Sequence, residues 1–112
     1  MRKLLVVAVL AALPASLLAA GPAVSARKTV EVDDNYFVRP GSPPRVKARR
    51  GDTVVWVWEG RNPHNVTVTR GPVKFSSATK RSGRYRKRMR RRGSYRIVCT
   101  VHAGMRMTLR VR

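Results

Sequence analysis

Four residues of types that bind transition metals occur in two segments of the chain. Cys99 is the only cysteine in the sequence; His102 follows it after three positions and Met105 after three more, whereas His64 lies far upstream. One thiolate, two imidazoles and one thioether form the ligand set of a trigonal copper site with a weak axial methionine. Zinc prefers further cysteine, histidine or carboxylate ligands in a tetrahedron. The residue types and their spacing therefore predict a copper site.

A lone cysteine also has other uses. With one cysteine the chain forms no internal disulfide, so Cys99 is inertly buried, joins two chains, acts as a nucleophile or binds a metal. A Cys/His nucleophile pair is the enzymatic alternative. No acyl-transfer signature surrounds it, and one small domain leaves little room for a substrate cleft. No catalytic acid, base or open metal position is evident in the sequence either, so we do not expect an enzyme.

The first 26 residues have the pattern of a secretory signal peptide. Arg2 and Lys3 precede an apolar run from Leu4 to Ala20, and small residues lead to a cleavage site after Ala26. Pro14 interrupts this run, and an unbroken membrane-spanning helix needs about 20 apolar residues. We therefore expect an exported protein, periplasmic or at the cell surface, with an uncleaved anchor as the alternative.

This division leaves residues 27–112 as one domain with the pattern of an all-β fold. Apolar and polar residues alternate in short runs, valine and aromatic residues are enriched, and Gly, Pro and Asn separate the runs. The runs are residues 29–34, 65–69, 84–89, 94–99 and 107–112. Two further runs lie one on each side of a turn at residues 50–52. Residues 74–83 are expected to form a longer irregular crossing. About seven or eight short strands in one domain predict an antiparallel sandwich or barrel.

Two segments carry a resemblance to a known protein family. PHNV, at residues 63–66, and YRIVCTVHAGM, at residues 95–105, resemble the blue copper proteins, or cupredoxins, and in particular their plastocyanin and amicyanin branch. The resemblance covers nearly the whole domain, from about Val30 to Val111, in the family's order of segments. It implies a single-domain antiparallel Greek-key β-sandwich.

The same resemblance implies the ligands of one type 1 copper ion. His64, Cys99 and His102 would be the equatorial ligands, and Met105 would be the axial ligand. Met107 is the alternative axial ligand. We favour Met105 because the residues after it lead into the final strand, as they do after the family's ligand methionine.

The resemblance also implies roles for the neighbours of the ligands. Asn65, beside His64, is expected to hydrogen-bond near Thr100 and so to orient the ligand loop. His102 is expected to show its ring edge at the surface, in an uncharged spot where a redox partner docks and the electron leaves. The uncharged residues of this spot are Pro63, Ala103 and Gly104.

The chain is strongly basic, with 25 lysine and arginine residues against five acidic ones and a formal net charge of +20. Lys80–Arg92 is mostly cationic, and within it Arg88, Arg90, Arg91 and Arg92 are expected to steer an acidic redox partner toward encounter. Anionic lipid headgroups or an anionic envelope polymer are alternative partners. Specific nucleic acid binding is not expected, because the chain has an export signal and no base-reading motif.

The leading interpretation is therefore an exported, monomeric one-electron carrier that cycles between Cu(I) and Cu(II). Two alternatives stay open from the sequence. One is a protein that holds or donates copper without redox turnover, and the other is a basic polyanion-binding module on a cupredoxin scaffold.

Overall fold

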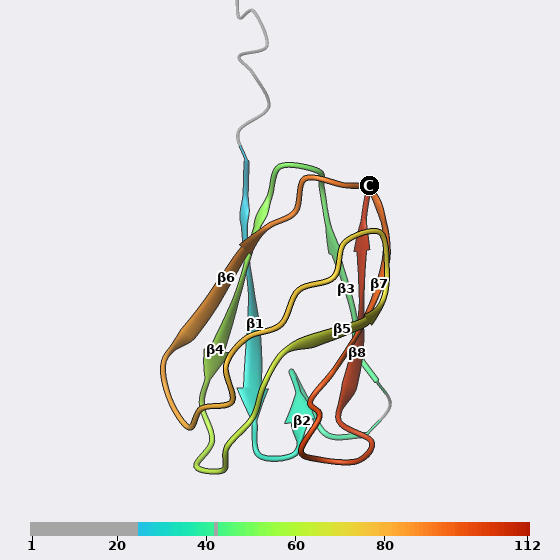
Figure 1. Cartoon of the computed structure of the whole chain (residues 1–112). Coiled ribbons are helices and arrows are strands. Elements are labelled where there is room, and N and C mark those ends of the chain that lie inside the picture. Colours follow the sequence, from blue (N-terminus) through green and yellow to red (C-terminus); the bar gives the residue numbers. More distant parts are fainter. Residues whose placement is uncertain (1–24, 42) are drawn as a thin grey trace, which may run out of the picture.

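A computed structural model describes residues 25–41 and 43–112, so nearly all of the expected signal peptide, residues 1–26, lies outside the described residues. The described part forms eight strands, shown in Figure 1. In this part of the chain, no helix is long and apolar enough to cross a membrane. The strands are β1 (Arg27–Asp33), β2 (Tyr36–Phe37), β3 (Arg45–Ala48), β4 (Thr53–Trp58), β5 (Thr67–Arg70), β6 (Arg84–Arg88), β7 (Gly93–Val98) and β8 (Arg106–Val111).

The strands form two four-stranded sheets that face each other across the core (Figure 1). One sheet has the order β2-β1-β4-β6 and the other has the order β3-β8-β7-β5. The predicted Greek-key β-sandwich is confirmed. Its strand pairing is mixed, because β1 pairs with β4 and β3 pairs with β8 in parallel. Between β1 and β4 the chain crosses to the other sheet as β3 and then returns, so that β4 runs in the same direction as β1.

The strands agree closely with the runs of alternating residues, with one addition. β2 is only two residues long and pairs with β1, and a segment so short shows no alternation by which to recognise it. The expected irregular crossing at residues 74–83 contains no strand. It is held by isolated bridges instead, between His64 and Lys80 and between Thr67 and Ser76.

The core between the sheets is built from side chains that alternate along the strands. Trp56, Tyr95 and Phe37 are the largest fully buried side chains, and Trp56 packs against Phe75 with ring centroids 6.0 Å apart. The indole Nε1–H of Trp56 donates a hydrogen bond to Met107 Sδ at 3.5 Å. Met107 on β8 is therefore tied to β4 of the opposite sheet through the core.

The predicted turn at residues 50–52 lies at the end of the sandwich opposite the predicted metal ligands. Gly51 adopts a φ of +96° there, a conformation that favours glycine. The carboxylate of Asp52 is buried and accepts the backbone N–H groups of Arg49 at 2.8 Å and of Ala26 at 2.9 Å. These two hydrogen bonds, the one from Arg49 first, lower the pKa of Asp52 below its ordinary value.

This carboxylate predicts how stability depends on pH. Because the folded-state pKa of Asp52 lies below the unfolded value of 3.8, its stabilisation is present above that value and is lost as the pH falls through the folded-state pKa. We expect Asp52→Asn to lose less unfolding free energy than the wild type between neutral pH and about pH 3. Urea unfolding of both proteins across that range measures the difference, and equal losses would contradict the role given to Asp52.

Candidate metal centre

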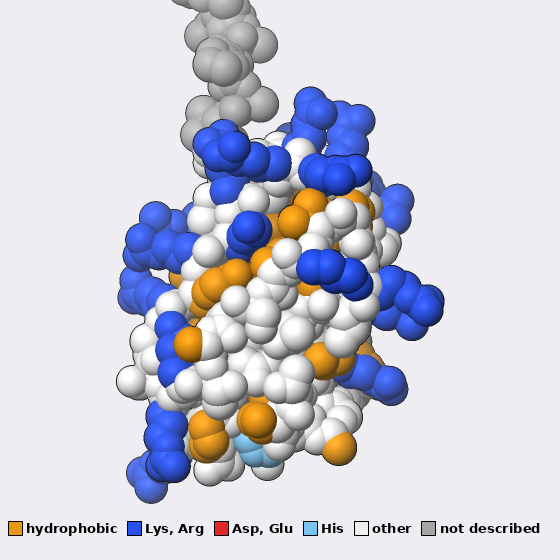
Figure 2. Space-filling view, viewed as in Figure 1, with side chains coloured by type: hydrophobic (Ala, Val, Ile, Leu, Met, Phe, Trp, Pro, Cys, Tyr) orange, Lys and Arg blue, Asp and Glu red, His pale blue; other side chains and the backbone are white. Residues whose placement is uncertain are grey.

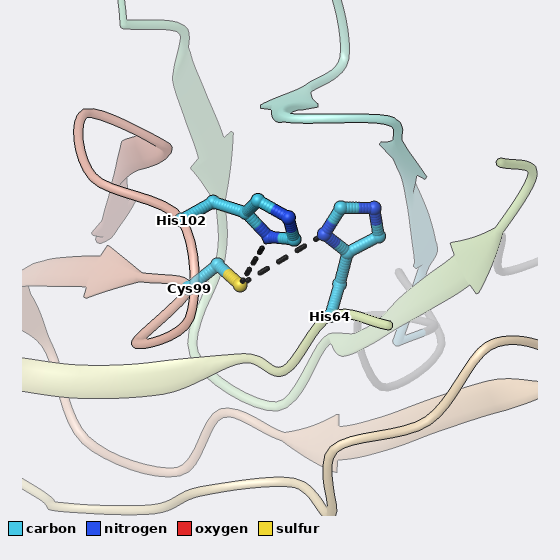
Figure 3. Close-up of side chains that lie close together, drawn as sticks. All are labelled: His64, Cys99 and His102. Carbon is cyan, nitrogen blue, oxygen red and sulfur yellow. Dashed lines mark hydrogen bonds between the residues drawn. The ribbon is translucent and has the colours of Figure 1, made fainter. Parts of the chain in front are cut away.

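Three side chains converge at one end of the sandwich (Figure 3). Cys99 directly follows β7, His102 lies in the turn between β7 and β8, and His64 lies shortly before β5. Cys99 Sγ is 3.9 Å from His64 Nδ1 and 3.6 Å from His102 Nδ1. One ligand atom from each residue lies within 4.8 Å of those of the other two. The structure thus brings together three of the four residues singled out by their metal-binding chemistry.

A tight turn places Cys99 and His102 beside each other. The Cys99 N–H donates to the Met105 carbonyl at 3.0 Å, and the Met105 N–H donates to the His102 carbonyl at 3.3 Å. Gly104 has a φ of +81° within this turn, which a residue with a side chain rarely adopts. Because the turn is closed by its own hydrogen bonds, the two ligands are positioned before any metal binds.

His64 is held from the other side by backbone pairing. It exchanges two N–H···O hydrogen bonds with Lys80, at 2.9 and 3.0 Å, and its carbonyl accepts the indole N–H of Trp58 at 3.2 Å. The ring of His64 is fully buried. The irregular crossing at residues 74–83 therefore has a structural task, which is to fix the backbone of one candidate ligand.

Asn65 joins the segment of His64 to the turn of Cys99. Its amide Nδ2 donates to Thr100 Oγ1 at 2.7 Å and to Thr79 Oγ1 at 3.0 Å. Its Oδ1 accepts the Thr100 N–H at 3.1 Å and the hydroxyl of Thr67 at 2.8 Å. One buried amide thus fixes three segments at once, and the Asn65–Thr100 pair considered in the sequence is in contact.

The comparisons with known proteins agree with this geometry. Residues 26–112 match the model of the copper-binding proteins of the plastocyanin/azurin family. The chain belongs to this family. A comparison with curated protein sequences found no significant match.

Solved structures of cupredoxins have the same fold. An oxidized amicyanin variant superposes with a TM-score of 0.62 and 27% identity, over 84% of this chain and 89% of that one. A purple cupredoxin from Nitrosopumilus maritimus has a TM-score of 0.64 and 21% identity, over 76% and 99%. The copper-containing nitrite reductase of Thermus scotoductus SA-01 has a TM-score of 0.64 and 24% identity, but the matched region covers 77% of this chain and only 22% of that enzyme.

The cofactor of this cupredoxin is one type 1 copper ion, and the residues present fit it. A thiolate and two imidazole nitrogens are the donors of such a site. Metal–nitrogen and metal–sulfur bonds are about 2.0–2.3 Å long, so a nitrogen and a sulfur bonded to one ion lie at most about 4.4 Å apart. The distances from Cys99 Sγ to the two Nδ1 atoms, 3.9 and 3.6 Å, lie within this limit. Both imidazoles turn Nδ1 toward the sulfur of Cys99, so each offers the same type of nitrogen.

Asp34 lies on the far side of the His64 ring and was not among the residues predicted from the sequence. Its Oδ1 lies 3.2 Å from His64 Nε2, and its carboxylate also accepts the backbone N–H groups of Asn62 and Arg61, at 2.8 and 2.9 Å. The Asn62 N–H contributes most to lowering the pKa of Asp34 to about 2. An ionised carboxylate only accepts hydrogen bonds, so it keeps the proton of His64 on Nε2 and leaves Nδ1 free for copper. A Cβ on Gly60 would collide with the Asp34 side chain, so this approach also requires the glycine.

We expect Asp34→Asn to raise the reduction potential of the copper site. The carboxylate makes His64 a more basic ligand and adds negative charge near copper, and both effects favour Cu(II). Removal of such an outer partner lowers metal affinity by roughly 10- to 100-fold, and here the loss should be larger for Cu(II). The matched control is Glu31→Gln, which removes a negative charge from an exposed residue of β1. Equal potentials in the two variants, measured by voltammetry, would refute a specific role for Asp34.

The two candidate axial methionines have different surroundings. Both are buried. Met105 lies in the ligand turn, and its backbone bonds to Cys99 and His102. Met107 lies in β8, and its sulfur accepts the hydrogen bond of Trp56 in the core. The sulfur of Met107 thus already has a partner away from the ligand turn.

The residues beside His102 in the candidate ligand turn are uncharged. His102 is half-buried and gives the only histidine surface visible in Figure 2, because His64 is fully buried. Ala103 and Gly104 are exposed beside it, and Val101 is 50% exposed. Val101 was not among the residues predicted from the sequence, although an apolar residue between two candidate ligands in a turn is a signal for such a patch. Half-buried Pro63 directly precedes His64.

The arginines that were expected to steer a partner lie at the other end of the molecule. Arg88 pairs with Thr53, the first residue of β4, whereas the copper ligands lie beyond the last residue of that strand. Arg90, Arg91 and Arg92 follow Arg88 and lead into β7. The structure therefore does not bring these four residues to the surface around His102.

Proposed function

We propose that this cupredoxin is an exported one-electron carrier whose copper is held by His64, Cys99 and His102, with Met105 as the axial ligand. Copper supplies the one-electron chemistry, because it alternates between Cu(I) and Cu(II). The observation that carries the proposal is the convergence of the three ligand atoms in a framework of hydrogen bonds. A framework that fixes its ligands in advance offers both oxidation states nearly the same surroundings, so little reorganisation accompanies each electron transfer.

We place the route of the electron at His102. It is the ligand whose side chain reaches the surface, whereas Cys99 is only 3% exposed and His64 is fully buried. The uncharged residues on either side of His102 in the turn allow a redox protein to approach closely, because none of them carries a charge that has to be desolvated. The same burial argues against a copper donor, since two of the three ligands would have to be uncovered before the ion could leave.

The test of this proposal is the visible spectrum of the purified protein after addition of one equivalent of Cu(II). A thiolate that binds Cu(II) in a trigonal site gives an intense charge-transfer band, so the protein should turn blue. Ascorbate should bleach the band, and an oxidant should restore it. Only the faint absorption of a tetragonal nitrogen and oxygen site would overturn the proposal.

The axial assignment has its own test in two methionine variants. A weak axial thioether tunes the potential of a blue site more than it holds the metal. We therefore expect Met105→Leu to keep the blue colour and to raise the reduction potential, because the lost donor had favoured Cu(II). Met107→Leu should leave the potential nearly unchanged and instead lower stability, because it removes the hydrogen bond of Trp56. A larger shift of potential in Met107→Leu would reverse the assignment.

A further inference from the structure

Many exposed arginines of the described residues lie at the end of the sandwich opposite the candidate copper ligands. Backbone hydrogen bonds join three segments there, from Arg50 to Arg112 and from Gly51 to Met89. Each of these segments presents exposed arginines. We call this surface the basic pole; its defining residues are Arg49, Arg50, Arg88, Arg90, Arg92 and Arg112.

The acidic residues of the chain lie away from the basic pole or face inward. Glu31, Asp33 and Asp34 lie in the second half of β1 and just after it, and Glu59 follows β4. The parallel pairing of β1 and β4 makes both strands run toward the copper end. Asp52 alone lies beside the pole, but it is only 3% exposed and accepts backbone hydrogen bonds. No other acidic residue is therefore available to neutralise the arginines of this surface.

The basic pole and the surface around His102 are too far apart for one small partner protein to contact both. They lie at opposite ends of β4, whose six residues span about 16 Å at roughly 3.3 Å per residue. In Figure 2, basic side chains crowd the upper end and the flanks, whereas the lower end around the histidine is mostly uncharged. An acidic redox protein bound at the basic pole would sit at the wrong end for electron transfer through His102.

We propose that the basic pole binds the anionic lipid surface of a membrane and so points the copper end away from it. The position at which the chain enters the domain, at the start of β1, favours a membrane as the partner. β1 begins at the pole, where Arg27 lies opposite Thr53 and Thr53 lies opposite Arg88. In the sequence, the apolar run Leu4–Ala20 ends a few residues before this point. If that run stays attached, it tethers the domain to a membrane by the basic end; if it is removed after Ala26, the new amino group adds positive charge there.

Electrostatic attraction alone accounts for this contact. Negatively charged headgroups attract nearby Lys and Arg side chains, and the attraction falls off within a Debye length of the surface. Among the described residues, the one large hydrophobic side chain that is well exposed is Val101, at the copper end, so the pole offers no large apolar group for insertion. The membrane contact is therefore peripheral, reversible and sensitive to salt. It leaves the His102 surface free for a soluble redox partner, and it does not depend on copper.

The experiment compares two quadruple variants that remove the same charge from opposite ends. Arg49, Arg50, Arg88 and Arg90 are changed to Gln at the basic pole. The control variant carries Gln at Arg39, Arg45, Arg81 and Arg106, which are exposed positions outside the pole. Co-sedimentation of the full chain is measured with vesicles of equal parts phosphatidylcholine and phosphatidylglycerol, and with pure phosphatidylcholine. The neutral vesicles correct for any binding through Leu4–Ala20.

At low ionic strength we expect the wild type and the control variant to bind the anionic vesicles, and the pole variant to bind them about tenfold or more weakly. High salt should abolish the difference. Equal weakening in both variants would overturn the proposal, because it would show that net charge rather than the pole decides binding. Equal binding of the wild type to anionic and neutral vesicles would also overturn it. So would tighter binding of the wild type to soluble polyphosphate than to anionic vesicles of equal total charge, which would assign the pole to an anionic polymer.

Discussion

Replacing Cys99 with Ser is expected to abolish the blue colour of the copper-loaded protein and to give the largest loss of copper affinity of any single substitution. Cys99 is the only cysteine of the chain, so no second thiolate is available to replace it. A serine hydroxyl is a hard oxygen donor, and it is not ionised at neutral pH. Soft thiolate ligands select copper, so Cu(I) binding should suffer as much as the colour does.

The fold should survive this substitution, because sulfur and oxygen differ little in size and Cys99 donates only its backbone N–H within the turn. Circular dichroism and urea unfolding of the metal-free variant check this point. The matched control is Ala103→Ser, which adds a hydroxyl at an exposed position of the same turn and should keep the colour. An intense visible band that persists in Cys99→Ser would mean that Cys99 is not a ligand.

Asn65→Ala is expected to cost about 2–4 kcal/mol of unfolding free energy in the metal-free protein, since each intramolecular hydrogen bond contributes about 0.5–1.5 kcal/mol net. The side chain is buried and makes four hydrogen bonds. Its loss removes the protein partner of the Thr100 N–H beside Cys99. The two ligand segments then lose their connection, so the copper-loaded variant should show a broadened spectrum as well.

Asn62→Ala provides the comparison for that measurement. It makes the same chemical change at an exposed residue whose backbone, not its side chain, bonds to Asp34. Surface substitutions of this kind usually change stability by less than about 0.5 kcal/mol. Similar losses in Asn62→Ala and Asn65→Ala, measured by urea unfolding, would show that the buried network does not hold the turn.

The parts of this protein that could be predicted from sequence are those that depend on short-range patterns. The strands follow from alternation within a few residues. The Cys99–His102 contact follows from their spacing in one turn. The distant ligand His64 was found through its chemical type and the resemblance of its segment to a family, not through any local rule.

The parts that could not be predicted depend on contacts between distant segments. Asp34 lies 30 positions before His64 in the chain, and nothing around it distinguishes it from an ordinary acidic turn residue. The parallel pairing of β1 with β4 likewise depends on how the chain crosses between sheets. The contact of Met107 with Trp56 is a matter of side-chain direction in the core. The charge of the chain could be counted, but the basic pole depends on three segments that meet only in the folded protein.

Voltammetry of the copper-loaded protein tests the central claim of electron transfer most directly. We predict one reversible one-electron wave, which persists over repeated cycles without loss of copper, because the same preformed ligands hold both oxidation states. An irreversible wave, or release of copper in one of the two oxidation states, would contradict the claim and identify a protein that stores or delivers copper.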